Sequence, residues 1–390
     1  MRAVVLAAGE GRRLRPLTEK RPKPMLPAAN APILEHVIDA LVAAGVEEIV
    51  LVVGYKRERI QNHFGDGTRF DVDITYVVQE PRLGTGDALL QAEQYLGGPF
   101  LVLNGNQIVE PSLLERLAET VSESGETTIS VTRAGEPERY GVVTLDGDRV
   151  ETFVEKPPPH AVDSELVSVG AYGFTPDVFA ALREIGPGSE VPGELQLTDV
   201  IRHFLDRSIR AVRYDGPWLQ LIQPWNLLTT NAELLQRDGS EIDETVRVDS
   251  DASVTEPVAL GRDVTLQPGA RVLPGTAVGP NVTVGPNTVV RNSVLLPDAT
   301  IGPGCVVRNT IVGAGTTLRS NVTVEDGISD IVIDGTIHPN VRFGGLVGDG
   351  CVVGANSTIR PGTIVGNDVV IDSAAVIDGI VDSGTHVRRG

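Results

Sequence analysis

The chain has 390 residues, a formal net charge of −19 and 41% apolar residues. This length allows two or three domains with cores of their own, and the ordinary share of apolar residues excludes a largely disordered chain. Because 52 acidic residues outnumber 33 basic ones, the chain would repel a phosphate backbone, and binding to DNA or RNA is disfavoured.

The basic residues are mostly arginines, since only four lysines occur: Lys20, Lys23, Lys56 and Lys156. An acidic, lysine-poor chain indicates a halophilic protein that is solvated for high salt, although a GC-rich genome would produce a similar bias. Two cysteines are too few for a disulfide framework. The sequence shows neither a signal peptide nor an apolar run long enough to cross a membrane, so we expect a cytoplasmic protein.

Strand-like and helix-like segments alternate over residues 1–235. In chain order, we expect a strand at 3–7, a helix at 33–43, and strands at 48–53, 74–78 and 99–103. This alternation is typical of a Rossmann-like α/β domain with a mostly parallel sheet covered by helices on both faces. Ligands of such sheets bind beyond the carboxyl ends of the strands.

A different pattern begins near residue 258, after the acidic and weakly apolar stretch 236–257, which we interpret as a linker. Apolar residues then recur at every sixth position in two unbroken runs: Leu266, Val272, Val278, Val284 and Val290, then Val347, Val353, Ile359, Val365, Ile371 and Ile377. A period of six fits neither an amphipathic helix nor an alternating strand. It is typical of the hexapeptide repeat of a parallel β-helix, with apolar residues inside and Gly, Asn and Pro at the corners. We therefore predict such a domain over residues 258–390, and it resembles the left-handed β-helix of hexapeptide-repeat acyltransferases.

A glycine-rich turn, Gly9-Glu-Gly11, follows the first predicted strand. Backbone N–H groups of such a turn can hold phosphate groups. The turn is neither a P-loop, because no Gly-Lys-Ser/Thr follows, nor a dinucleotide fingerprint, because the third glycine is missing. Arg13 and Lys23 add two cations suited to a triphosphate. The alternative is a tight turn with solvated basic residues.

The stretch Leu6-Ala-Ala-Gly-Glu-Gly-Arg-Arg-Leu14, with a downstream Pro-Lys-Pro, resembles the signature of nucleoside-triphosphate:sugar-1-phosphate nucleotidyltransferases. Further segments resemble that family in the expected order: 79–88, 101–106, 140–143, 154–157, 193–199 and 218–226. The resemblance covers residues 1–235. Together with the repeat, it points to the long archaeal, GlmU-like form, for which we expect a homotrimer.

The resemblance implies transfer of a nucleotidyl group from dTTP or UTP to a sugar-1-phosphate such as glucose-1-phosphate, with release of pyrophosphate and with Mg²⁺ as cofactor. The catalytic cations would be Arg13 and Lys23. The implied nucleotide-binding residues are Leu6, Ala8, Gly9, Gly11, Gln79, Gly84 and Thr85. The implied sugar-phosphate-binding residues are Gly141, Glu155, Lys156, Ser168 and Glu194.

Two positions depart from the family pattern. Asn106 and Gln220 stand where the family places its metal ligands, an Asp and an Asp or Asn. Mg²⁺ prefers anionic oxygens, so these neutral amides form a weakened metal site. Three interpretations stay open: an enzyme whose metal rests mainly on substrate phosphates, with Asp87 or another carboxylate assisting; an impaired paralogue that binds nucleotide or nucleotide-sugar and regulates or assembles a partner; or a CoA-dependent acetyltransferase in the β-helix, with His338 as its base.

Overall fold

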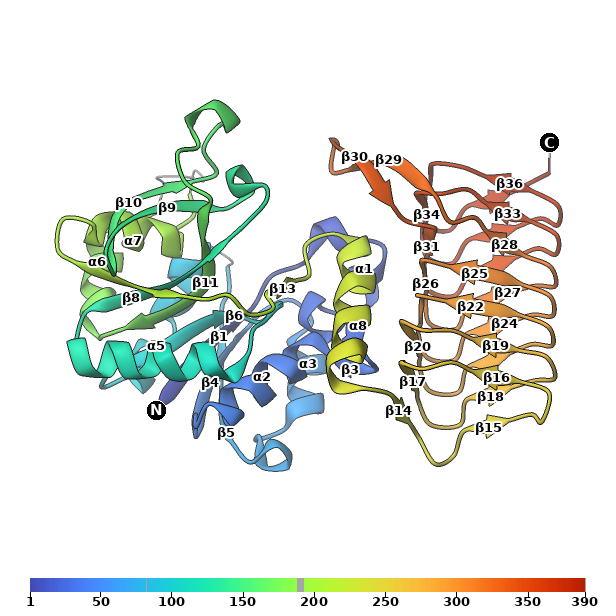
Figure 1. The fold of residues 1–390 in the computed structure, drawn as a ribbon, viewed down its shortest axis with the longest axis horizontal. Helices are drawn as coiled ribbons and strands as arrows, with labels where there is room; N and C mark the ends of the chain where they lie inside the picture. Colours follow the sequence, from blue (N-terminus) through green and yellow to red (C-terminus); the bar gives the residue numbers. More distant parts are fainter. Residues whose placement is uncertain (82, 188–192, 390) are drawn as a thin grey trace. The chain divides into compact units, whose positions relative to one another are not determined.

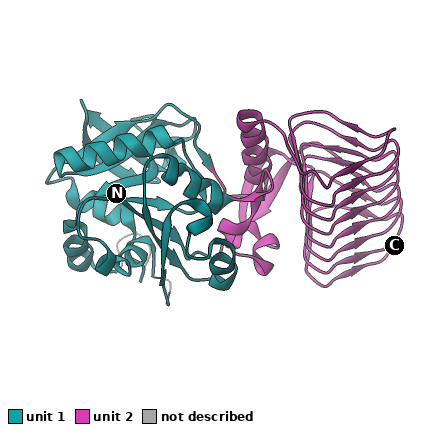
Figure 2. Cartoon of the chain, turned by 90° about the horizontal axis from the view of Figure 1, so that it is seen from below, with its two compact units in different colours: residues 1–10, 33–219 teal, residues 11–32, 220–390 magenta. Residues whose placement is uncertain are grey.

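The computed structural model describes residues 1–81, 83–187 and 193–389, so Arg82 of the expected base-recognition segment lies outside the described residues. The chain divides into two compact units. Unit 1 comprises residues 1–10 and 33–219, and unit 2 comprises residues 11–32 and 220–390 (Figure 2). The second unit therefore includes a short segment from near the N-terminus, which no local pattern in the sequence indicates.

Unit 1 is built on a mixed sheet of nine strands, counted over the described residues (Figure 1). In spatial order these are β5 (Asp73–Val78), β4 (Glu48–Val53), β1 (Arg2–Ala7), β6 (Phe100–Asn104), β11 (Leu166–Phe174), β8 (Thr127–Arg133), β12 (Ile209–Arg213), β10 (Arg149–Glu155) and β9 (Gly141–Asp146). The first four pair in parallel, whereas β11 pairs antiparallel with both β6 and β8. The expected strands at 3–7, 48–53, 74–78 and 99–103 are confirmed as β1, β4, β5 and β6.

Helices of unit 1 connect these strands. They are α2 (Ile33–Ala43), α3 (Arg57–Phe64), α4 (Thr85–Leu90), α5 (Pro111–Ser124), α6 (Asp177–Ile185) and α7 (Leu197–Phe204). The bounds of α2 agree with the helix expected from its apolar spacing. Strand β1 forms the centre of the parallel part, where Ala3, Val4 and Val5 are fully buried, because a strand covered on both faces needs apolar residues at consecutive positions.

Unit 2 is a left-handed parallel β-helix with three strand sheets, preceded in the chain by helix α8 (Pro224–Asp238) (Figure 1). One sheet contains β14 (Glu241–Ile242), β17 (Val258–Leu260), β20 (Thr276–Val278), β23 (Val294–Leu295), β26 (Thr310–Val312), β31 (Gly345–Val347), β34 (Thr363–Val365) and β37 (Ile380–Val381). The second contains β15 (Arg247–Val248), β18 (Thr265–Leu266), β21 (Thr283–Val284), β24 (Thr300–Ile301), β27 (Thr317–Leu318), β32 (Val352–Val353), β35 (Val370–Ile371) and β38 (His386–Val387). The third contains β16 (Ser253–Val254), β19 (Arg271–Val272), β22 (Val289–Arg291), β25 (Val306–Arg308), β28 (Thr323–Val324), β33 (Thr358–Ile359) and β36 (Val376–Ile377).

The residues of both period-six runs are buried in one continuous core inside the coils. Asparagines at the corners, such as Asn281, Asn321 and Asn356, adopt positive φ, which Asn tolerates better than other side chains. The expectation of an inward apolar column with Asn corners is therefore confirmed. Strands β14 to β16, within the stretch interpreted as a linker, already pair with β17 to β19 as a first coil. The boundaries 1–235, 236–257 and 258–390 stay a prediction.

Two further features belong to unit 2. A hairpin of β29 (Ile328–Ile333) and β30 (Thr336–Arg342) interrupts the repeat. The N-terminal segment carries α1 (Leu17–Lys20), three-residue 3₁₀ turns at Arg12–Leu14 and Lys23–Met25, and the short strands β2 (Pro27–Ala28) and β3 (Ala31–Pro32). No helix within the described residues is long and apolar enough to cross a membrane.

Candidate functional site

The carboxyl ends of β1 and β6 lie next to each other in unit 1. Leu6 pairs with Asn104, and the amide of Gly105 donates a hydrogen bond of 2.9 Å to the carbonyl of Leu6. Leu6 and Ala8 bury their side chains, whereas a Cβ added to Gly9 would meet nothing within 4 Å. The turn after β1 therefore presents open backbone at the same sheet edge as the loop that carries Asn106.

Gln79 follows the last residue of β5 and is only 4% exposed. Its Nε2 donates to the carbonyl of Gly84 at 2.9 Å and to Oδ2 of Asp87 at 2.7 Å. Both amide hydrogens are used in these bonds, so the side chain offers a ligand only the acceptor Oε1. Asp87 serves to orient this amide, and the same carboxylate also accepts from Gln91.

Gly84 and Thr85 are held against residues 195–197. Gly84 has φ +100°, and a Cβ there would lie 2.3 Å from the carbonyl oxygen of Leu195, so only glycine fits. The Thr85 hydroxyl donates to Oε1 of Gln196 at 2.9 Å and accepts from the amide of Leu197 at 3.0 Å. Gln196 in turn donates to Glu194 at 2.6 Å. The Thr85 side chain is thus occupied within the protein.

Three of the expected sugar-phosphate residues are brought together at the β9–β10 pair. Gly141 pairs with Glu155, and a Cβ on Gly141 would lie 3.0 Å from the Glu155 carboxylate and 2.4 Å from the Phe153 ring. Nζ of Lys156 lies 3.0 Å from Oε1 of Glu155. Lys156 adopts φ +44°, and its amide donates to the carbonyl of Tyr140, which turns the chain sharply after β10.

Ser168 is buried in β11, where its Oγ accepts a hydrogen bond of 3.3 Å from the amide of Gly170. The register of β11 against β8 is interrupted between Ser168 and Tyr172. This irregularity places Gly170 against the β6 side of the sheet, where Nε2 of Gln107 donates to its carbonyl at 2.8 Å. Ser168 therefore helps to shape the strand beside the Asn106 loop.

The expected metal positions carry no charge. Asn106 lies in the loop after β6, and Gln220 ends the short strand β13 (Leu219–Gln220) in unit 2. Asp87, the carboxylate that we expected to assist, is engaged by two glutamine amides. Within the described ranges, no group of three or more His, Cys, Asp or Glu could hold a metal ion. This donor set does not fit a resident Mg²⁺ ion, which prefers carboxylates.

The expected phosphate-binding cations belong to unit 2. Gly11 has φ +68°, and a Cβ there would lie 2.8 Å from Cβ of Lys23, so the turn packs directly on this lysine. Burial, together with the neighbouring Arg13 guanidinium, lowers the pKa of Lys23 to about 8. Arg13 itself is exposed in the 3₁₀ turn. Gly11, Arg13 and Lys23 therefore form one cluster of backbone and cationic groups.

His338 lies on β30 and packs against the start of α8. Its ring is 5.3 Å from the Trp225 ring, and its Nε2 is 3.2 Å from Nε2 of Gln223, which is itself buried. The histidine therefore packs against an aromatic ring and an amide, which is the surrounding of a structural side chain. The expectation that it acts as an acetyl-transfer base stays a prediction.

Sequence reasoning missed two contributors to these loops and expected a different role for Asp87, which positions Gln79. The first is Gln107, which positions Gly170 and which no local pattern marks, since it directly follows the polar Asn106. The second is an aromatic pair, Tyr140 and Trp218, whose ring centroids are 5.0 Å apart beside the Gly141 turn. Burial raises the pKa of Tyr140, and Nε1 of Trp218 is buried without a partner among the described atoms.

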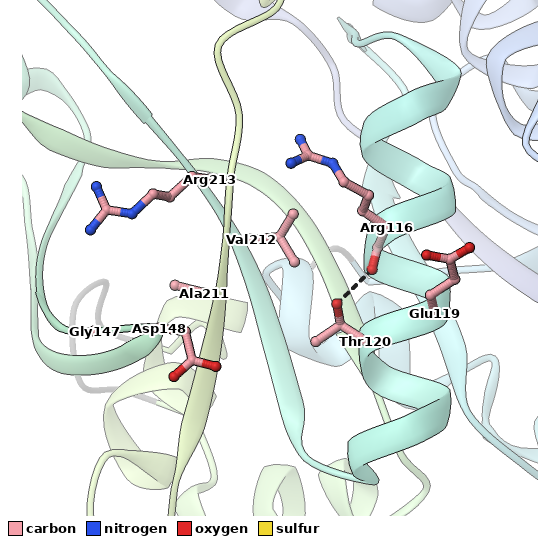
Figure 3. Close-up of a pocket in the computed structure, with 8 residues that line it drawn as sticks. All are labelled: Arg116, Glu119, Thr120, Gly147, Asp148, Ala211, Val212 and Arg213. Atoms are coloured by element: carbon pink, nitrogen blue, oxygen red, sulfur yellow. Dashed lines mark hydrogen bonds between the residues drawn. The ribbon is translucent and has the colours of Figure 1, made fainter.

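A cavity of about 350 Å³ in unit 1 contains none of the expected site residues. Helix α5, the turn Gly147–Asp148 and strand β12 line it (Figure 3). The guanidinium groups of Arg116 and Arg213 do not converge in Figure 3, and Asp148 is paired with Arg210 at 2.5 Å. The cavity therefore lacks a convergent anion site, and the sheet edge is the better candidate.

Comparison with known proteins identifies the family of this chain. The profile of the nucleotidyl transferase family matches residues 2–236, which is more than half of the chain. The chain belongs to the nucleotidyl transferase family. Profiles of the GMPPB C-terminal domain and of the hexapeptide repeat of succinyl-transferase match this nucleotidyltransferase at residues 254–342 and 346–378.

Similar proteins cover either the whole chain or its first domain. The bifunctional protein GlmU of Methanococcus maripaludis strain S2 is 32% identical, over 100% of this chain and 97% of its own length. The UTP–glucose-1-phosphate uridylyltransferase AglF of Haloferax volcanii is 38% identical, over 57% of this chain and 92% of its own. A crystal structure of UDP-glucose pyrophosphorylase with UDP-glucose shares the fold, with a TM-score of 0.55 and 24% identity over 60% of this chain and 98% of its own. The nucleotidyltransferase thus resembles the archaeal, GlmU-like form.

Proposed function

We propose that this protein transfers the nucleotidyl group of UTP or dTTP to a sugar-1-phosphate of the glucose-1-phosphate type and releases pyrophosphate. The observation that carries the proposal is the arrangement of Gln79, an acceptor buried at the sheet edge, in the same unit as the Gly141–Glu155–Lys156 cluster. The names of the relatives, GlmU and the uridylyltransferase AglF, support the same class of reaction.

The choice of uracil or thymine comes from the family resemblance, and the acceptor of Gln79 is compatible with it. Because both of its amide hydrogens are bound to Gly84 and Asp87, Oε1 can only accept a hydrogen bond from a donor group of the base. The N3–H group of uracil and thymine supplies this donor, whereas the same ring nitrogen of cytosine is an acceptor. The backbone of Gly84 would approach the base closely, because glycine has no side chain. The backbone of Thr85, the next residue, would lie beside it.

The sugar-1-phosphate would bind at the β9–β10 turn. Gly141 lets the Phe153 ring and the Glu155 side chain lie against the backbone, and the Glu155 carboxylate can accept hydrogen bonds from sugar hydroxyls. Lys156 offers its ammonium to the phosphate, in place of its ion pair with Glu155. Ser168 and Glu194 are proposed as further contacts to the sugar.

The triphosphate would bind to the turn after β1, with Leu6 and Ala8 holding the backbone of Gly9 and Gly11 in place. In the transfer, a phosphate oxygen of the sugar-1-phosphate attacks the α-phosphorus. A new P–O bond forms, and the bond from the α-phosphorus to the bridging oxygen breaks, so that pyrophosphate leaves. Arg13 would neutralise the leaving group and Lys23 the α-phosphate. No general base is needed, because the attacking oxygen is already an anion.

No step of this proposal uses a resident metal ion, since Asn106 and Gln220 do not fit one. The same amides favour a second candidate function, in which the protein binds nucleotide or nucleotide-sugar without turnover and acts as a regulatory or assembly subunit. The base and sugar sites would then be retained, while charge compensation for the transfer would be lost.

The experiment that separates these functions measures binding and turnover on the same preparation. UTP or dTTP, supplied as its Mg²⁺ salt in high-salt buffer, is titrated by calorimetry, and pyrophosphate release is then followed with glucose-1-phosphate. We expect binding and release of pyrophosphate. Binding without release would replace the transferase by the binding subunit, and absence of binding would contradict both functions.

A further inference from the structure

Residues 11–32, here called the strap, belong to the β-helix unit although they precede it by about two hundred residues in the chain. The strap carries Gly11, Arg13 and Lys23, the groups that we assign to the nucleotide phosphates. It is bonded to the β-helix at two places. Near its end, Nδ2 of Asn30 donates to the carbonyl of Val278 at 3.0 Å, and the amide of Ala29 donates to Asn231 of helix α8 at 2.8 Å.

The other attachment is a buried polar network near the far coils. Nη2 of Arg21 lies 2.6 Å from Oδ2 of Asp349, and the exposed fractions of the two side chains are 13% and 4%. The second oxygen of Asp349 accepts from the amide of Ala314 at 2.8 Å. Nη1 of Arg21 is buried without a partner among the described residues, so Asp349 is the group that compensates this guanidinium.

Asn367 extends the network to the other side of the strap. Its Nδ2 donates to the carbonyl of Pro16 at 3.1 Å and to Oε2 of Glu19 at 2.7 Å, while its Oδ1 accepts from the amide of Asp349 at 2.8 Å. Asn367 is 2% exposed. The strap is therefore bonded on both sides of α1, at positions between Arg13 and Lys23.

We propose that Arg21, Asp349 and Asn367 are positioning residues for the phosphate-binding cations, so that the β-helix orders the strap before nucleotide arrives. The physical reason is that Arg13 and Lys23 carry like charges and repel each other; burial first, and then this repulsion, lowers the pKa of Lys23. A free loop would separate them, and its ordering would cost binding free energy. The proposal rests on the proposed function, because it assigns the two cations to nucleotide phosphates.

The structure offers a matched control. Lys20, also on the strap, forms an ion pair with Asp368 at 3.0 Å, but both side chains are exposed, at 41% and 64%. An exposed pair contributes little, whereas removal of one partner of a buried pair leaves an uncompensated charge. Asp368→Asn therefore removes the same charge from the neighbouring coil without releasing the strap.

The test compares Asp349→Asn, Arg21→Met and Asp368→Asn in the full chain by hydrogen exchange and by calorimetry with UTP and with inorganic pyrophosphate. We expect the first two variants to speed exchange at strap amides such as Leu14, Glu19 and Leu26, which are hydrogen-bonded in the wild type. If the ordered strap falls to one tenth of the molecules, the Kd for both ligands rises about tenfold. Asp368→Asn should change neither quantity. Arg21→Lys, which keeps the cation, should recover part of the affinity.

Unchanged strap exchange in Asp349→Asn and Arg21→Met would overturn the proposal. Faster exchange with unchanged Kd would also overturn it, because the network would then serve stability alone. Arg21→Met changes only the strap, so it keeps the test valid if Asp349→Asn prevents the β-helix from folding, which circular dichroism and melting would reveal. If the wild type binds neither ligand, the proposed function fails, and the exchange rates still decide whether the network orders the strap.

Discussion

The two units hold their site residues in different ways. In unit 1, Gln79, Gly84 and the Gly141 turn are positioned by side-chain hydrogen bonds and by backbone approaches that only glycine allows. In unit 2, Arg13 is an exposed cation and Lys23 a half-buried one, on a strap that is hydrogen-bonded to the coils of the β-helix. Under the proposed function, the sheet would recognise the base and the sugar, whereas compensation of phosphate charge would depend on the strap, because the expected metal positions are neutral.

The largest expected effect comes from placing carboxylates at the two neutral metal positions, 106 and 220. The double variant Asn106→Asp/Gln220→Asp should raise the rate of pyrophosphate release on the order of 1,000-fold, since anionic ligands for a cation at the developing charge stabilise the transition state. The measurement is steady-state pyrophosphate release from UTP and glucose-1-phosphate. Asn62→Asp/Gln94→Asp adds the same charge at exposed positions and should leave the rate unchanged. An equal rate in both variants would show that metal charge is not what limits turnover.

One added methyl group at Gly84 should disturb the close packing of its backbone against Leu195 in unit 1. Gly84→Ala should lower the free energy of unfolding of unit 1 by about 3 kcal/mol, because the new Cβ meets the Leu195 carbonyl and φ is positive. Urea denaturation followed by circular dichroism measures the change. Gly98→Ala is the control, since a Cβ there meets nothing within 4 Å and its φ is not positive. Similar midpoints for both variants would contradict the proposed constraint.

The role of the strap cations predicts a pH dependence. In the free protein, the pKa of Lys23 is lowered to about 8, and a bound phosphate should raise it. Binding is then favoured by the protonated lysine, so affinity for UTP should be constant below pH 8 and fall about tenfold per unit above it. Calorimetry between pH 6.5 and about 9.5 tests this. Lys23→Arg keeps its charge and should abolish the decline; a persistent decline would assign it to another group.

The smallest expected effect comes from a variant of Lys156, which tests whether this lysine contacts the sugar-1-phosphate or the nucleotide. Lys156→Ala should raise the KM for glucose-1-phosphate about tenfold, because it removes one charge-assisted hydrogen bond to the phosphate. The Kd for UTP should stay unchanged. Lys56→Ala removes a lysine of the same unit that lies outside the family motifs and serves as the control. A change in UTP affinity in Lys156→Ala would place this lysine at the nucleotide instead. If the protein does not turn over, calorimetry with glucose-1-phosphate replaces the KM.

Local patterns in the sequence predicted the elements well where one period dominates. The apolar spacing of residues 33–43 gave the bounds of α2, and the period-six column predicted the buried residues from Leu266 to Ile377. The Gly9 turn and the Pro-Lys-Pro segment led to the family. The sequence did not predict that the sheet is mixed, because a buried apolar strand has the same sequence pattern whether its neighbours run parallel or antiparallel.

Composition and periodicity by themselves determined an acidic two-part molecule with an α/β sheet and a β-helix, and the motifs around Gly9 and Lys23 added the resemblance to nucleotidyltransferases. Only the tertiary structure decided that Asp87 orients Gln79, that Thr85 is occupied by Gln196, and that the strap belongs to the β-helix unit. Periodicity records how residues a few positions apart share one face of an element. The bond between Arg21 and Asp349 joins residues more than three hundred positions apart, and chain geometry, rather than any local repeat, brings them together.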